Sequence, residues 1–99
     1  MRLTPEQRQI IVAAVRQTLG PHARARLFGS RTDDRQRGGD IDLLVELPEL
    51  PPDAAWQAAR LEARLQQLLG EQKIDVVLAG PGNADSPIVQ EALRTGLPL

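Results

Sequence analysis

Residues 40–47 read Asp-Ile-Asp-Leu-Leu-Val-Glu-Leu, an apolar run that carries two carboxylates at its start. Such a run predicts a β-strand, in which alternate side chains point to the same face of a sheet. Asp40 and Asp42 therefore share one face, with Cα atoms roughly 6.6 Å apart, while Ile41 points to the other. Two carboxylates at this spacing can converge on one divalent cation, and their oxygen atoms favour Mg²⁺ or Mn²⁺. The strand is therefore a candidate metal site.

A third carboxylate lies in a second β-branched run, Lys-Ile-Asp-Val-Val-Leu at residues 73–78. If this run forms another strand of the sheet, Asp75 can complete the cation site. The plainer alternative is an exposed aspartate paired with Lys73, an interaction worth little at a protein surface. We favour the metal role because the acids occur together with a Gly-Ser pair upstream.

That pair is Gly29-Ser30, separated from Asp40 by nine residues. Glycine lets a backbone approach a ligand closely, and serine offers a hydroxyl and an N–H to a phosphate oxygen. A short helix beginning after Ser30 would add its positive N-terminal end to this anion site. Three arginines follow in the connecting segment, and Arg31 is the best candidate among them to bind phosphate. The sequence thus predicts a nucleotide and its metal ions in one place.

The rest of the chain alternates helical patterns with short apolar runs. A helix is expected from Pro5, capped by Thr4 with Gln7 reaching back, and it ends before Gly20. Strands are expected over residues 23–28, 40–47 and 72–79, further helices over 53–69 and 86–94, and an extended tail over 96–99. This order predicts an α/β or α+β fold, with helices packed against a small sheet of about three strands.

The helix expected after residue 53 carries both a leucine stripe and the single tryptophan of the chain. The stripe is expected to be buried; it consists of Leu61, Leu65, Leu68 and Leu69. Core packing is the default expectation for Trp56, which is surrounded by alanines. An exposed tryptophan would instead suit a protein interface.

Composition narrows the chemistry available to the chain. It has no cysteine and one histidine, which excludes disulfides, thiolate metal sites and a histidine cluster within one chain. A net charge of −1 gives no general attraction to nucleic acid. Without a long apolar run or an apolar leader, we expect no membrane span and a cytoplasmic location. Residues 1–99 are expected to form a single domain.

Taken together, these motifs make the chain resemble the nucleotidyltransferases of the DNA polymerase β superfamily, which carry Gly-Ser, a spacer, Asp-x-Asp and a later strand aspartate. More narrowly, Phe-Gly-Ser-Arg followed by Gly-Gly-Asp-Ile-Asp-Leu-Leu-Val is similar to the minimal nucleotidyltransferases (MNT), many of which pair with helical HEPN toxins. The similarity spans nearly the whole chain and implies a mixed sheet. One departure is the nine-residue spacer, which is a residue shorter than the ten commonly seen.

The resemblance implies an enzyme that depends on Mg²⁺ or Mn²⁺ and transfers a nucleotidyl group to a hydroxyl of a partner protein, and AMP from ATP is the group expected. The partner implied is a HEPN toxin, with this chain as its antitoxin. Asp40 and Asp42 would bind the metals, and Asp75 would hold the catalytic metal and help to deprotonate the hydroxyl. Gly29 and Ser30 would grip the departing phosphates.

Two alternatives stay open. The chain can be a non-catalytic antitoxin that neutralises a HEPN ribonuclease by forming a complex, with a vestigial or regulatory nucleotide site. It can also transfer nucleotides to an antibiotic or an RNA end, although relatives of that kind usually carry an added substrate domain. A homo- or hetero-oligomer is compatible with the apolar tail at residues 96–99.

Overall fold

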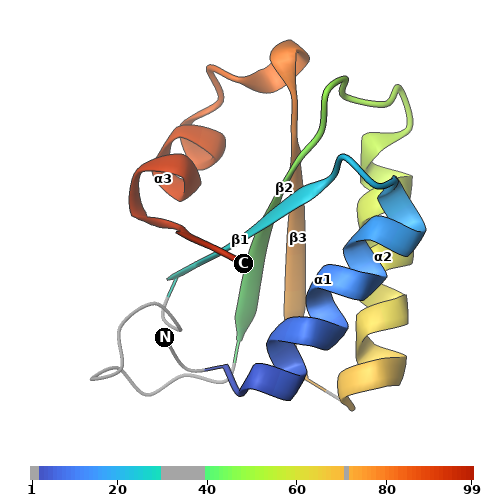
Figure 1. Ribbon diagram of the computed structural model, residues 1–99. Coiled ribbons are helices and arrows are strands. Elements are labelled where there is room, and N and C mark those ends of the chain that lie inside the picture. Colours follow the sequence, from blue (N-terminus) through green and yellow to red (C-terminus); the bar gives the residue numbers. More distant parts are fainter. Residues whose placement is uncertain (1–2, 30–39, 71) are drawn as a thin grey trace.

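Three helices and four strands make up the computed structural model, which describes residues 3–29, 40–70 and 72–99 (Figure 1). In chain order the elements are α1 (Pro5–Leu19), β1 (Arg24–Phe28), β2 (Ile41–Glu46), α2 (Ala54–Leu69), β3 (Ile74–Ala79), a short 3₁₀ turn η2 (Pro81–Asn83), α3 (Pro87–Thr95) and β4 (Leu97–Pro98). Within the described part of the chain, no helix is long and apolar enough to span a membrane.

The strands form one sheet in the order β3-β2-β1-β4. β2 and β3 run parallel, whereas β1 is antiparallel to both β2 and β4. The expected mixed sheet is confirmed, with one addition at its edge. The tail expected to be merely extended pairs with β1, Leu97 opposite Leu27 and Pro98 opposite Arg26. The sheet therefore has four strands rather than about three.

Helix α1 begins as its sequence indicates. The Thr4 hydroxyl accepts a hydrogen bond from the Gln7 amide at 3.1 Å, and the Gln7 side chain accepts one from the Thr4 amide at 3.0 Å. This capping box satisfies two amides that the helix itself leaves unpaired. The helix ends at Gly20, whose positive φ of 109° suits a residue without a Cβ.

Helices α1 and α2 cover one face of the sheet, and α3 covers part of the other (Figure 1). The larger core lies under α1 and α2, where Ile11, Leu43, Leu61 and Leu65 are fully buried. A smaller cluster lies under α3; its buried residues are Phe28, Leu44, Ala79, Val89 and Ala92. The face under α3 is therefore only partly covered by apolar packing.

Two expectations for α2 are wrong. Trp56 is 61% exposed, with the Arg60 guanidinium 5.4 Å from the centre of its ring. At 100° per residue Trp56 lies about 140° around the helix from Leu61, so it points away from the buried stripe. Leu61 and Leu65 are buried and Leu69 packs against the core, but Leu68, in the last turn, is 39% exposed.

One edge of the sheet is covered by a side chain of α2. The Glu62 carboxylate accepts a hydrogen bond from the Val76 amide of β3 at 2.8 Å. An edge strand normally exposes such amides to water or to other strands. Glu62 therefore protects the outer edge of β3 and ties α2 to it.

We expect Glu62→Ala to lower the free energy of unfolding by about 1–2 kcal/mol, because a partly buried amide loses its acceptor. Glu62→Gln retains an acceptor oxygen and should lose less than half as much. Urea unfolding followed by circular dichroism measures both. Equal losses in the two variants would show that the Val76 hydrogen bond contributes nothing.

Candidate functional site

Strand β2 divides its side chains between the two faces of the sheet. Ile41, Leu43 and Val45 are fully buried against α1 and α2. Asp42 alternates with these residues and lies on the opposite face of the sheet. Leu44 shares this face and packs against α3. Asp40 directly precedes the strand and is half-exposed. Asp42 therefore lies on the face that the period of the strand predicts, whereas Asp40 precedes β2, which begins at Ile41.

The parallel register brings the third acid to the same place. Asp42 and Asp75 are directly opposite each other in the pairing of β2 with β3. Neighbouring strands lie about 4.8 Å apart, so the two side chains project side by side from one face. Both strands begin at the lower end of Figure 1, whereas α3 lies higher. We call Asp40, Asp42 and Asp75 the acidic cluster.

A lysine supplies a positive charge beside this cluster. The Lys73 ammonium lies 3.8 Å from an Asp40 carboxylate oxygen, and the Ile41 amide donates to the Lys73 carbonyl at 2.9 Å. The sequence suggested a pair between Lys73 and Asp75 as the plain alternative, but the ion pair formed is with Asp40. Because Lys73 lies two residues before Asp75, the sequence predicts that the two side chains share a face. Which acid pairs with Lys73 depends instead on the register between β2 and β3.

Gly29 connects the end of β1 to the acidic cluster. Phe28, the last residue of β1, is paired with Asp42, and Gly29 follows with a φ of +77°. A Cβ at Gly29 would overlap the Asp42 Oδ2 atom. The left-handed backbone therefore favours glycine, and a Cβ at this position would force the Asp42 carboxylate to move. Ser30 and Arg31, the other two expected nucleotide-binding residues, lie outside the described residues.

The environment of Asp42 disfavours its charged form. Its pKa is raised above the ordinary value of 3.8, first by burial and then by the negative charges of Asp75 and Asp40. Lys73 opposes this shift, since its positive charge lowers the pKa. A carboxylate whose pKa is raised by two like charges lies in an electrostatic environment that a cation would relieve.

The donor set fits a hard divalent cation, because all three acidic side chains offer only oxygen ligands. Over residues 3–29, 40–70 and 72–99, however, no three histidine, aspartate or glutamate side chains are gathered closely enough to enclose a metal ion. Asp75 and Asp40 both act electrostatically on Asp42, but the three carboxylates do not form a closed metal site.

Comparison with known protein families shows where the acidic cluster and Gly29 lie within a known domain. The family model of the nucleotidyltransferase domain matches residues 9–93, which include Gly29 and the whole acidic cluster. The chain belongs to the nucleotidyltransferase domain family. Domains of this family generally use a nucleoside triphosphate and a divalent metal. No curated protein matches the chain.

Two solved structures share the fold of this nucleotidyltransferase domain. One is a mutant of the toxin–antitoxin complex MntA–HpeT, with a TM-score of 0.65 and 23% identity over 97% of this chain and 71% of the other. The second is the tri-AMPylated HEPN toxin of Shewanella oneidensis in complex with an MNT antitoxin. Its TM-score is also 0.65, with 21% identity over 94% of this chain and 68% of the other. At these identities the likeness establishes the fold.

The contact between Gly29 and Asp42 is open to a double-mutant test. Gly29→Ala should lower the free energy of unfolding by about 1–3 kcal/mol through backbone strain, with the overlap at Asp42 adding to it. Adding Asp42→Ala should restore part of the loss, giving a coupling energy of about 0.5–3 kcal/mol. Denaturant unfolding of the four proteins in the cycle measures it.

Gly20 supplies the matched control. It also has a positive φ, but a Cβ there would meet nothing within 4 Å. Gly20→Ala should therefore be strained and show no coupling to Asp42→Ala. The same coupling at both glycines would contradict a specific contact with Asp42.

The raised pKa of Asp42 predicts how stability varies with pH. The folded protein holds this proton more tightly than the unfolded chain, so stability falls as pH rises from 3.8 through the folded-state pKa. In EDTA, Asp42→Asn should raise the melting temperature at pH 7, and the gain should shrink towards zero as pH falls below 3.8. Thermal melts at several pH values check this. A gain in melting temperature at Asp42→Asn that persists in acid would contradict the charge-based explanation.

Proposed function

We propose that this nucleotidyltransferase domain transfers AMP from ATP to a hydroxyl group of a partner protein, and that the partner is a helical HEPN-type toxin. The observation that carries the proposal is the register that sets Asp42 opposite Asp75, with Gly29 against the Asp42 carboxylate. It accompanies a family match over most of the chain. Two structures with the same fold belong to toxin–antitoxin complexes, and one of them holds a tri-AMPylated toxin.

The charges of the acidic cluster support a cation between protein and nucleotide. Three carboxylates and one ammonium leave a net negative face, which would repel the triphosphate of ATP. Asp40, Asp42 and Asp75 would hold Mg²⁺ or Mn²⁺. When bound, such an ion neutralises phosphate charge and aligns the attacking and leaving oxygens.

Residues of the chain would take part in the transfer reaction in different ways. The acceptor hydroxyl oxygen forms a bond to the α-phosphorus of ATP, the bond to the β-phosphate oxygen breaks, and pyrophosphate leaves. Asp75 would accept the hydroxyl proton. Gly29 leaves room for the nucleotide phosphates to approach the backbone, and Ser30 and Arg31 would donate hydrogen bonds to them.

The test is transfer of label from ATP carrying radioactive α-phosphate, in Mg²⁺, onto the purified candidate toxin. Asp40→Asn/Asp42→Asn should reduce labelling about a hundred-fold or more, because the cation loses two of its ligands. Asp53→Asn/Asp85→Asn makes the same change in charge at two exposed acids and should label as well as the unmodified protein. The proposal is supported if label on the toxin is lost in Asp40→Asn/Asp42→Asn and retained in Asp53→Asn/Asp85→Asn.

The binding-module alternative makes the opposite prediction. If no triphosphate gives label, while the Asp40→Asn/Asp42→Asn protein still forms a complex that silences the toxin, the proposal fails and neutralisation occurs by complex formation alone.

A further inference from the structure

The ion pair between Lys73 and Asp40 lies directly at the acidic cluster. The two residues immediately precede β3 and β2, whose first residues, Ile74 and Ile41, are partners in the register. The Lys73 carbonyl also accepts the hydrogen bond from the Ile41 amide at 2.9 Å. The sheet therefore fixes the backbone of Lys73, while its long side chain can still move.

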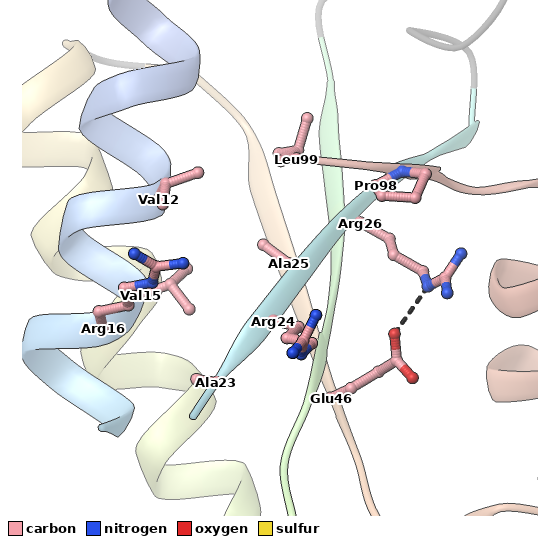
Figure 2. A pocket seen from close by; sticks show the side chains of 10 residues that line it. All are labelled: Val12, Val15, Arg16, Ala23, Arg24, Ala25, Arg26, Glu46, Pro98 and Leu99. Atoms are coloured by element: carbon pink, nitrogen blue, oxygen red, sulfur yellow. Dashed lines mark hydrogen bonds and ion pairs between the residues drawn. The ribbon is translucent and has the colours of Figure 1, made fainter. Parts of the chain in front are cut away.

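The contact between the two side chains is loose. The Lys73 ammonium is 3.8 Å from the nearest Asp40 oxygen, and the lysine side chain is 68% exposed. The ion pair between Arg26 and Glu46, elsewhere in the sheet, is much closer at 2.7 Å, and its arginine is 28% exposed (Figure 2). A guanidinium can bind a carboxylate through two parallel hydrogen bonds, whereas an ammonium is a hydrated point charge. Lys73 can therefore leave its carboxylate easily.

The charge of Lys73 neutralises the acidic cluster only in part. It lowers the pKa of Asp42, but burial and the charges of Asp75 and Asp40 together outweigh this effect. A divalent cation brings twice the charge of an ammonium to the same carboxylates, and two cations held close together repel each other. Binding of a metal ion and the ion pair of Lys73 with Asp40 therefore oppose each other.

We propose that Lys73 is a displaceable counter-ion of the acidic cluster, which gives up Asp40 to a divalent cation and then pairs with a phosphate of the nucleotide. This inference rests on the proposed function, because it takes metal and triphosphate to bind at this cluster. A metal ion alone has to displace the ammonium. A metal ion that binds together with the nucleotide offers the ammonium a new partner, so Lys73 makes the binding of each favour the binding of the other.

The first measurement is the binding of Mn²⁺ alone, followed by the electron paramagnetic resonance signal of the free ion. Lys73→Met removes the charge and should tighten binding about three-fold or more, because the metal no longer competes with an ammonium. Lys73→Arg should not tighten it, since a guanidinium holds a carboxylate at least as firmly. Asp40→Asn/Asp42→Asn should weaken binding about ten-fold or more, which assigns the measured Mn²⁺ to the acidic cluster.

Arg16→Met supplies the matched control. It removes one positive charge from an exposed position near the end of α1, which covers the opposite face of the sheet. Its Mn²⁺ affinity should stay within about two-fold of the unmodified protein, because solvent and salt screen a charge so placed.

The second measurement is calorimetric binding of an ATP analogue with a methylene group between its α- and β-phosphates, in saturating Mn²⁺. Lys73→Met should bind this analogue about three-fold or more weakly, because a phosphate loses its positive partner. The same substitution thus acts in opposite directions on metal alone and on nucleotide with metal. A lysine that only stabilised the sheet would not produce this reversal.

The sequence offers a direct view of the side chain. Of the 12 lysine and arginine residues of the chain, Lys73 is the one lysine. Reductive methylation with ¹³C keeps its positive charge and gives one lysine signal in NMR spectra besides that of the amino terminus. This signal should shift on addition of Mg²⁺ and shift again with the analogue, and Mg²⁺ should not shift it in Asp40→Asn/Asp42→Asn.

Several results would overturn the inference. They are unchanged or weaker Mn²⁺ binding in Lys73→Met, equal tightening in Arg16→Met, unchanged binding of the analogue in Lys73→Met, or no binding of Mn²⁺ or analogue at millimolar concentrations. These measurements follow binding rather than transfer. The expected affinities without transfer of AMP would contradict the proposed function alone, whereas a labelled toxin with unchanged Mn²⁺ affinity in Lys73→Met would contradict this inference alone.

Discussion

The parallel pairing of β2 with β3 is the constraint on which the rest of the molecule depends. It buries Ile41, Leu43 and Val45 on one face beneath α1 and α2, and the period of two then leaves Asp42 on the other. A shift of the β2 register by one residue would exchange the two sets, placing carboxylates in the core. The same hydrophobic burial that stabilises the sheet therefore also places its charged groups.

The acidic cluster is held at some cost to stability. Burial and two neighbouring carboxylates disfavour the ionised form of Asp42, and Lys73 offsets only part of this effect. Protein folds accept such conflicts mainly where a ligand later relieves them. The contact with Gly29 adds a second constraint, since this carboxylate lies where any other residue would place its Cβ. The end of the sheet where we propose that nucleotide and metal bind is thus distinguished by both its local geometry and its local charge.

Much of this arrangement could be predicted from short-range pattern. The cap at Thr4, the end of α1 at Gly20 and the face on which Asp42 lies all follow from residues a few positions apart. What could not be predicted depends on pairing over long distances. Lys73 finds Asp40 only through the register of β2 with β3, and the tail becomes β4 only because β1 has an open edge. The exposure of Trp56 follows from its angular position on α2, and residue type alone does not predict it.

The hydrogen bond from the Val76 amide to Glu62 makes the two edges of this sheet unequal. A sheet with two bare edges can add copies of itself without end, which is how strands propagate into fibres. Here one amide of the β3 edge is held by a carboxylate of its own chain, so a strand added at this edge would have to displace Glu62 before it could pair fully. Addition of strands at β3 is therefore disfavoured, which protects this edge of the domain against open-ended polymerisation.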